Sequence, residues 1–537
     1  MKQKYLSFSC GCKFPINENG GCLFDTNLDS INMSCSKTWD LISEGNTKGC
    51  FQLESRLGQS MSKKLKPSNI EQLSGLISIL RPGCLEAFRD GKSVSNHYID
   101  KKNHLEDIDY FHPSLEEILK STYGEMIYQE QAMQITQKIA GFDLREADML
   151  RKAIGKKKPE EMAKIKKRFL SGCKKINEVS NEEAEEIFGW IEKSQRYSFN
   201  KSHAISYAMN AFLSAYAKAH FPKMFFASYL KFAKDKIDPQ QEIKELIRNA
   251  SEMDVFVFTP DIRKANQYFI VDSDNIFFGL TDIKGVGNSV FDKIKDIIDN
   301  GFDINSTKWV YVLLGLLNHI NSTAAKALIS SGALDHLGKT RTSMLFELDL
   351  ISSLTKKEAE FCQNICNEND SLELLLTKLL DKPRTNINRK KKIQDTINLL
   401  KNPPYSLQDK IEWLSDSESS LLGAAISCCK LDSYDISMTN SDCKTFKKTH
   451  INQNIIIAGE ISGVNVVKTK KGKNPGQEMA FVTIEDSTGI LDSVIMFPET
   501  WHQYKHHIFN SNVLVFVGNK TKQSDGLIVD KCFDAHT

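Results

Sequence analysis

The sequence lacks a long apolar run. Nowhere in its 537 residues is there a stretch of about 18 consecutive apolar side chains, which a membrane-spanning helix requires. The first residues, MKQKYLSFSCGCKF, contain no apolar segment of the kind that secretory signals carry. These absences predict a cytoplasmic protein with no membrane partner.

An excess of charge of either sign is also missing. The chain has 70 Lys and Arg against 68 Asp and Glu, so its net charge of +2 indicates no class of partner. Any signal for nucleic acid must therefore be local. The chain has no internal repeat and no low-complexity tract, and 41% of its residues are hydrophobic. A chain of this length and composition is typical of a globular protein with several domains.

The cysteines lack the spacing of an ordinary zinc ribbon. There are 13 of them, an odd number scattered along the chain, which favours reduced thiols. Cys10, Cys12, Cys22 and Cys35 lie close in sequence, and their thiolates could bind Zn²⁺. The close pair Cys10–Cys12 is not followed by a second close pair. We therefore expect ordinary thiols here and keep zinc as the less favoured alternative.

The spacing of apolar residues changes along the chain and predicts an α+β multidomain protein. A polar segment over residues 1–45 precedes a densely helical one over 46–222. Residues 223–345 hold shorter helices and a glycine-containing turn, and residues 346–450 form a Lys-rich, less structured helical connector. Residues 451–537 contain β-branched runs separated by turns, as in a small β-barrel.

Basic residues concentrate in one segment. Residues 151–175 contain 11 basic and 2 acidic side chains. A turn at Gly155 carries Lys156, Lys157 and Lys158 and precedes Pro159, which is well placed to begin a helix. Such a turn can present ammonium and backbone N–H groups to phosphates. The plainer alternative is a solvated helix face.

Six short motifs resemble, in order and spacing, the C-terminal half of the bacterial DNA polymerase III alpha subunit, a family C replicative polymerase. The motifs are GCFQLES (49–55), LRPGCLEAF (80–88), TYGEMIYQEQAM (122–133), ADMLRKAIGKKKPEEMAK (147–164), YSFNKSHAISYA (197–208) and KAHFP (218–222). The resemblance implies a DNA-directed DNA polymerase, a nucleotidyltransferase of DNA replication. It also implies that residues 46–222 are the fingers with the adjoining palm.

The resemblance assigns roles to several cations. Arg151 and Lys152 match the paired cations that meet the incoming triphosphate, although the family usually has two arginines there. Lys201 and His203 are further candidates for nucleotide or DNA contact, and their alternative is a helix-start network capped by Asn200 or Ser202. Arg81 could bind phosphate or brace the turn at Pro82-Gly83. Lys156, Lys157 and Lys158 would line the same groove and contact DNA.

The catalytic carboxylates of the family are not found. Family C polymerases hold two Mg²⁺ ions on palm aspartates, the first two in a D-x-D motif upstream of the fingers. No such motif precedes Gly49. The two D-x-D sequences that are present, Asp107-x-Asp109 and Asp272-x-Asp274, lie after Gly49, on the wrong side of the fingers motifs. Asp25, after Phe24, is a weak candidate for the third aspartate, and its alternative is a surface aspartate in a turn. The sequence therefore does not locate the ligands of these Mg²⁺ ions.

Two readings account for this gap. In the first, a separate chain bearing the palm and exonuclease completes the enzyme, as in a split replicase of a virus or bacteriophage; a truncated gene model is its rival. In the second, the chain is a non-catalytic DNA-binding replication component derived from the same family. Primer-template DNA and deoxynucleoside triphosphates are the implied partners. A sliding clamp is expected from the family, but no clear clamp-binding peptide is present.

Two downstream segments resemble DNA-handling modules of the same subunit. Lys284, Gly285 and Gly287 lie in a helix-hairpin-helix loop, where glycines allow close backbone approach and N–H groups bind phosphates without reading sequence. Residues 451–537 resemble an OB-fold, which binds single-stranded template through a basic groove and stacked aromatics. Lys470 and Lys471 lie in its basic hairpin, and Phe481, Phe497 and Trp501 are possible stacking residues, with Phe481 favoured as core.

Overall fold

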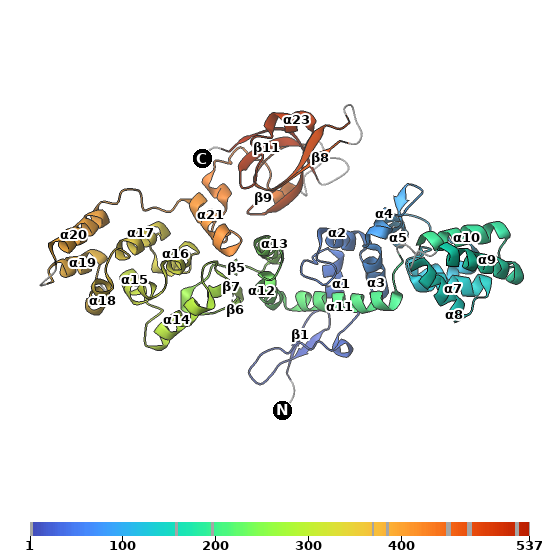
Figure 1. Ribbon diagram of the computed structural model, residues 1–537, viewed down its shortest axis with the longest axis horizontal. Helices are drawn as coiled ribbons and strands as arrows, with labels where there is room; N and C mark the ends of the chain where they lie inside the picture. Colours follow the sequence, from blue (N-terminus) through green and yellow to red (C-terminus); the bar gives the residue numbers. More distant parts are fainter. Residues whose placement is uncertain are drawn as a thin grey trace. The chain divides into compact units, whose positions relative to one another are not determined.

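The computed structural model describes residues 4–155, 159–194, 198–367, 370–382, 386–446, 453–469, 475–520 and 526–535. The chain divides into two compact units, Met1–Phe225 and Phe226–Thr537. Figure 1 shows the helices and strands of both units and labels many of them. Within the described residues, no helix is long and apolar enough to span a bilayer.

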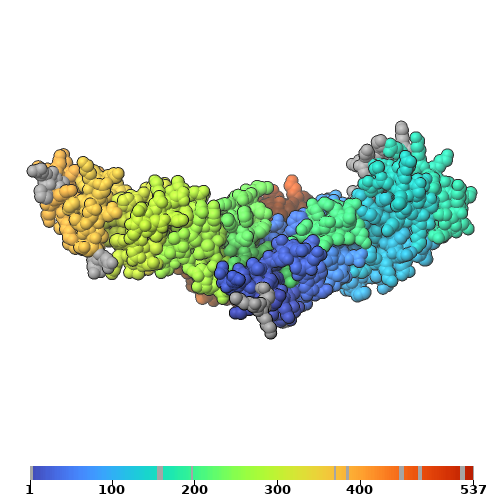
Figure 2. Space-filling view, turned by 90° about the horizontal axis from the view of Figure 1, so that it is seen from below, coloured from blue at the N-terminus to red at the C-terminus, as the bar shows by residue number. Residues whose placement is uncertain are grey.

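One long helix, α11 (Lys201–His220), organises the first unit. It packs along α3 (Ile70–Ile79) and α1 (Ser36–Ser43). Local signals set the start of α3, because the Asn69 side chain accepts a hydrogen bond from the Gln72 N–H at 2.9 Å, as an N-cap residue should. The N-terminal residues, dark blue in Figure 2, lie on the outside of this unit. They form a hairpin of β1 (Tyr5–Ser7) and β2 (Lys13–Pro15).

A second helical layer of this unit surrounds its own core. The helix α9 begins at Pro159, as predicted, and packs on the helix α7 through buried residues that include Ile135 and Phe169. The remaining elements of the unit are α2 (Arg56–Leu65), α4 (Pro82–Glu86), β3 (Phe88–Arg89), β4 (Lys92–Ser93), α5 (Val94–Lys102), α6 (Glu116–Leu119), α7 (Gln129–Ala140), α8 (Leu144–Gly155), α9 (Pro159–Ile176) and α10 (Asn181–Ser194).

The second unit begins with short elements. The helix α12 (Pro222–Ala233) carries the chain into it. A small sheet then precedes the helix α14, which follows Gly287 as the glycine motif predicts. These elements are α13 (Pro239–Glu252), β5 (Val257–Phe258), β6 (Ile270–Asp272), β7 (Asn275–Phe277), α14 (Asn288–Asp299), α15 (Trp309–Gly315) and α16 (Ser322–Ser330).

The segment predicted as a less structured connector is instead a packed set of helices. They are α17 (Arg341–Ile351), α18 (Lys356–Ile365), α19 (Leu372–Leu380), α20 (Ile387–Lys401), α21 (Ile411–Leu422) and the short α22 (Cys443–Phe446). Arg341 is buried and pairs with Asp335 at 2.7 Å and with the fully buried Glu418 at 2.8 Å. Glu418 also accepts hydrogen bonds from the Ile426 and Ser427 amides at 2.6 and 2.8 Å. A buried, paired charge of this kind ties sequence-distant helices together.

The C-terminal strands close into a five-stranded barrel in the order β10-β12-β11-β8-β9. The strands are β8 (Asn454–Lys468), β9 (Glu478–Asp486), β10 (Gly489–Met496), β11 (Val513–Lys520) and β12 (Leu527–Asp534), with α23 (Pro498–Tyr504) between β10 and β11. Alternate residues such as Val482 and Phe516 fill its interior. The predicted fold class, a mainly helical chain ending in an OB-like barrel, is confirmed.

Candidate nucleotide and nucleic-acid sites

The N-terminal end of α11 is fixed by a glutamate from another helix. Asn200 is the N-cap residue, and its side-chain oxygen accepts from the His203 N–H at 2.9 Å. Its amide donates to the Glu130 carboxylate at 2.7 Å, and the Lys201 N–H donates to the same carboxylate at 2.9 Å. The helix-start network that the sequence suggested is therefore present, and Glu130 is the partner that sequence did not identify.

Three of the motifs meet at this helix end. Phe199 and Tyr128 are joined by a parallel bridge in which Phe199 N–H donates to the Ile127 carbonyl at 2.9 Å. The Arg81 guanidinium lies over the Phe199 ring, 3.5 Å from its centroid. The His203 ring lies 5.4 Å from the same ring. Residues far apart in sequence are thus gathered around one aromatic side chain.

Lys201 adds a second cation to this cluster. Its Nζ lies 3.3 Å from a Glu71 carboxylate oxygen and 5.5 Å from the centroid of the Tyr128 ring. Burial raises the pKa of Tyr128 to about 12, so its phenol stays neutral, and its hydroxyl is within 2.9 Å of Ser74 Oγ. The Lys201 and Glu71 side chains are 35% and 52% exposed, and a pair this exposed is easily exchanged for another anion.

Arg151 and Lys152 have a different setting, on α8. Both pair with Asp148, at 2.8 and 2.7 Å. The hydrogen bonds from Lys152 and then from Arg151 lower the pKa of Asp148. In the parts of the chain that the structure describes, no ion pair or hydrogen bond joins this pair of cations to Arg81, Lys201 or His203. Lys156, Lys157 and Lys158 lie outside the described residues. A single cradle built from all these cations stays a prediction.

The candidate aspartates are each engaged in local contacts. Asp25 accepts from the Ser30 hydroxyl at 2.7 Å and from the Asn27 N–H at 2.9 Å, which are the contacts of a turn residue. Asp272 pairs with Lys264. Asp109 pairs with Lys101. Each of these carboxylates has a local partner. Within the described residues none of them belongs to a group of three or more metal-ligating side chains, so these residues show no cluster that fits two Mg²⁺ ions.

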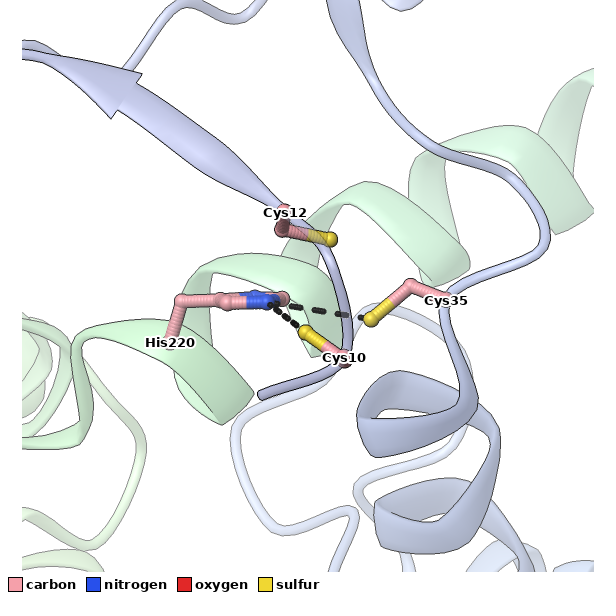
Figure 3. A group of neighbouring side chains, drawn as sticks. All are labelled: Cys10, Cys12, Cys35 and His220. Atoms are coloured by element: carbon pink, nitrogen blue, oxygen red, sulfur yellow. Dashed lines mark hydrogen bonds between the residues drawn. The ribbon is translucent and has the colours of Figure 1, made fainter. Parts of the chain in front are cut away.

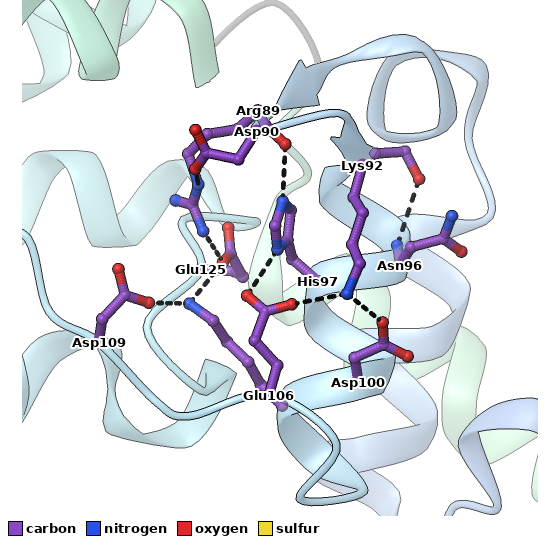
Figure 4. A network of polar contacts seen from close by, with 11 residues as sticks. Arg89, Asp90, Lys92, Asn96, His97, Asp100, Glu106, Asp109 and Glu125 are labelled. Atoms are coloured by element: carbon purple, nitrogen blue, oxygen red, sulfur yellow. Dashed lines mark hydrogen bonds and ion pairs between the residues drawn. The ribbon is translucent and has the colours of Figure 1, made fainter.

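The pairing of Asp109 belongs to a larger ionic network (Figure 4). The fully buried Lys101 lies 3.0 Å from Glu125, and Arg89 lies 2.7 Å from the same carboxylate. His97 Nδ1 lies 2.7 Å from Glu106. A buried lysine between carboxylates braces a fold. The network therefore joins Glu125 of the 122–133 motif to Arg89, which directly follows the 80–88 motif, and we assign it a structural role.

Three of the four cysteines singled out by sequence do meet. Cys10, Cys12 and Cys35 lie together with His220, and their ligand atoms are all within 4.8 Å of one another. Cys22 is not in this group. It lies beside Ile16 in an isolated bridge. The less favoured zinc alternative included Cys22, which the structure leaves out of the group. His220 of the KAHFP motif lies with the other three cysteines.

The glycine turn before α14 presents its backbone to solvent. Gly285 has φ +97°, a conformation that favours glycine, and Lys284, Gly285 and Gly287 are exposed while Val286 is buried. A side chain at Gly287 would meet no atom within 4 Å. The turn therefore leaves room for a phosphate backbone to approach the start of α14. Asp282, just before the turn, is half-buried, and burial of its carboxylate raises its pKa to about 6.

The barrel places its aromatic residues differently from expectation. Trp501 is only 8% exposed and belongs to the barrel core, so it cannot stack on a base. Phe481 lies between the buried residues Ala480 and Val482 and is itself half-buried on the opposite face of β9, so its expected core position is wrong. Phe497 is exposed. Lys470 and Lys471 lie outside the described residues.

Comparison with known proteins agrees with this arrangement. Residues 15–177 match the family model described as the bacterial DNA polymerase III alpha subunit finger domain, and residues 254–344 match the helix-hairpin-helix motif. Proteins named DNA polymerase III subunit alpha are 31% identical over 530 residues in Treponema pallidum and 30% identical over 520 residues in Pseudomonas aeruginosa.

These matches cover 97% and 93% of this chain but only 42% of each relative. A third, from Aquifex aeolicus, is 31% identical over 92% of this chain and 38% of its own length. The predicted resemblance is thereby confirmed. The chain is related over nearly all of its length to bacterial DNA polymerase III alpha subunits, and it carries their finger domain followed by a helix-hairpin-helix region.

Proposed function

We propose that this chain takes part in template-directed DNA synthesis, as the nucleotide- and DNA-binding part of a DNA polymerase III alpha-like nucleotidyltransferase. One observation carries the proposal: at the N-terminal end of α11, Arg81 and His203 lie against Phe199, and Lys201 lies beside Tyr128. The finger-domain match, which includes Arg81, and the full-length similarity support it.

The reaction would be attack of a primer 3′-hydroxyl on a deoxynucleoside triphosphate with release of pyrophosphate. Such a transfer depends on positioning and on cations that neutralise developing charge. In this proposal Arg81 and Lys201 hold the anionic tail of the nucleotide. The exposed Lys201–Glu71 pair opens as the phosphate takes the place of the glutamate. Arg151 and Lys152 contribute from α8, with Asp148 as their resting partner.

The catalytic metal ions are assigned to a separate polypeptide chain. Two Mg²⁺ ions are expected for a polymerase, but Asp25, Asp109 and Asp272 each have a local partner, and none belongs to a metal-ligating group within the described residues. The proposal assigns the catalytic carboxylates to a palm- and exonuclease-bearing chain. A sliding clamp as a further partner, and a viral or bacteriophage source, remain predictions.

The DNA contacts are divided between two modules. The turn would bind duplex phosphates through the backbone N–H groups of Gly285 and Gly287 and the exposed Lys284 side chain, without reading sequence. The barrel would bind the single-stranded template, with Phe497 as an exposed aromatic and Lys470 and Lys471 as cations. Both contacts would weaken as salt rises, because phosphate binding releases counterions.

Primer extension tests this proposal. The purified chain is assayed alone and with a candidate palm-bearing polymerase chain, and binding of a fluorescent deoxynucleoside triphosphate is measured in parallel. We expect extension only with the partner, and nucleotide binding that Arg81→Ala and Lys201→Ala weaken. Lys64→Ala, which removes an exposed lysine at the end of α2, is the matched control. Nucleotide binding that is absent, or equally affected by the control, contradicts the proposal.

A second candidate is a non-catalytic replication component that binds DNA. The local pairing of Asp25, Asp109 and Asp272 favours it. Intact duplex binding, with no nucleotide binding and no extension in either mixture, would decide for this candidate.

A further inference from the structure

At the opposite end of α11, four side chains of the types that ligate metals point toward one another (Figure 3). Cys10 and Cys12 come from the turn between β1 and β2, Cys35 is the N-cap residue of α1, and His220 is the last residue of α11. Within the described ranges, no other set of three or more His, Cys, Asp or Glu side chains meets in this way.

The distances match a tetrahedral site. With bonds of about 2.3 Å to sulfur and 2.0 Å to nitrogen, the ligand atoms of a zinc tetrahedron lie roughly 3.5–3.8 Å apart. His220 Nε2 lies 3.4 Å from Cys10 Sγ and 3.7 Å from Cys35 Sγ. All four ligand atoms lie within 4.8 Å of one another. Only small side-chain rotations separate this arrangement from full coordination.

The histidine is held in the tautomer that a metal needs. His220 Nδ1 lies 2.9 Å from the Tyr216 carbonyl oxygen, which can only accept, so Nδ1 carries the proton and Nε2 offers its lone pair to the cluster. Zinc-binding histidines are commonly oriented by a carbonyl in this manner.

The surroundings are dry and aromatic. Cys35 is fully buried, and Cys12 and His220 are each 4% exposed. The Phe8, Phe14 and Tyr216 rings lie 4.8, 5.2 and 4.3 Å from the His220 ring. The Asn32 amide donates to Cys12 Sγ at 3.8 Å. Cys10 is half-buried, so the shell covers three of the four ligands closely. Four protein ligands leave no open position on the ion, which is the pattern of a structural zinc site.

The N-terminal segment has little buried apolar surface of its own to hold it in place. Its strands have only three residues each, and among the hydrophobic side chains described before Cys35 only Cys12, Phe14 and Ile31 are buried. A segment this poor in apolar burial is commonly stabilised by a metal or a disulfide. The cysteines here are free thiols.

We propose that Cys10, Cys12, Cys35 and His220 bind one Zn²⁺, which fastens the N-terminal segment and the start of α1 to the C-terminal end of α11. The ion is structural and separate from the metals of catalysis. Because four protein ligands fill the tetrahedron, no substrate binds to it.

Metal analysis of the full chain tests this inference. The protein is purified under reducing conditions from zinc-supplemented medium, and its zinc is counted by mass spectrometry. We expect one zinc per chain in the parent, loss of most of it in Cys12→Ser and His220→Gln, and full retention in Cys22→Ser. Cys22 is the matched control, because it lies in the same segment but outside the cluster. Absence of zinc in the parent, or equal loss in Cys22→Ser, overturns the inference.

Substitution of the metal keeps the test independent of variants that fail to fold. The parent chain is loaded with Co²⁺ and its absorption spectrum is recorded. Three thiolates and one imidazole around Co²⁺ give intense visible bands and a thiolate charge-transfer band in the near ultraviolet. A weak spectrum without that band overturns the inference. Neither measurement uses nucleotide or DNA, so its failure is distinct from failure of the proposed polymerase function.

Discussion

The two ends of α11 use polar side chains in opposite ways. At the N-terminal end, Lys201 and Glu71 form a pair that solvent reaches. At the C-terminal end, about 30 Å away along a 20-residue helix, His220 and Cys35 are buried. At the N-terminal end, an anion from solvent can replace Glu71 beside Lys201. At the C-terminal end, His220 and Cys35 can change partners only if this part of the protein unfolds locally. One helix thus joins a place suited to binding with a place suited to fastening.

This difference separates what each change should affect. Changes at the fastened end should reduce stability and leave any nucleotide affinity of the intact protein unchanged. Changes at the exposed end should do the reverse, because exposed ion pairs contribute little to folding. Residues that anchor the exposed end, such as Glu130 and Asn200, should lie between these extremes.

Removing the metal should give the largest effect. A chelator that strips Zn²⁺ under reducing conditions should lower the free energy of unfolding by several kcal/mol, because structural zinc contributes its binding energy to folding (about 10 kcal/mol or more in small zinc peptides). Hydrogen exchange should show loss of protection over residues 4–35 first. Readdition of Zn²⁺ should restore it, and protection that survives chelation would break the comparison.

Glu130→Ala should give the second-largest loss in the free energy of unfolding. Its removal leaves the Asn200 amide and the Lys201 N–H without their acceptor at a half-buried position. Stranding such donors costs about 1–3 kcal/mol. Denaturant unfolding measures this. The matched control is Glu117→Ala, because Glu117 is 85% exposed and its pair with Lys138 lies at the surface, so about 0.5 kcal/mol or less should be lost there.

Two variants of Asn200 separate the contribution of the N-cap from that of the hydrogen bond to Glu130. Asn200→Ala removes both the cap to His203 and the donor to Glu130 and should cost about 1–2 kcal/mol. Asn200→Ser retains a capping oxygen and should recover much of that loss, about 1 kcal/mol. Thermal unfolding of the two variants checks this. Equal destabilisation by both would show that the contact with Glu130, and not the cap, holds this end of the helix.

The sequence was informative where the signal is local. The N-cap at Asn69, the helix beginning at Pro159 and the helix after Gly287 follow from residues within one turn of each boundary. The six motifs identified the family because they preserve order and spacing. The periodicity of the last segment predicted the barrel, since alternating burial leaves a period of two in the sequence.

What sequence could not supply is contact between distant segments. His220 lies 185 residues after Cys35, so no spacing rule for cysteine-rich sites connects them. Glu71 lies outside the six motifs and Glu130 lies in a different motif from Lys201, and only the packing of helices brings them to Lys201. The Lys-rich composition of the segment after residue 345 hid a packed core, because exposed lysines dominate a sequence even where Leu375 and Leu379 are buried.

The smallest effect on stability, and the most specific on binding, should come from the Lys201–Glu71 pair. Lys201→Ala should change the free energy of unfolding by about 0.5 kcal/mol or less, yet weaken nucleotide binding about tenfold by removing a phosphate ligand. Glu71→Gln should do the opposite and strengthen binding about threefold, because the phosphate no longer competes with a carboxylate for Lys201. On a Lys201→Ala background, Glu71→Gln should have no effect, since it acts only through that lysine. Titration with a fluorescent nucleotide measures all four proteins, and a gain that persists without Lys201 would mean that Glu71 merely repels the triphosphate from a distance.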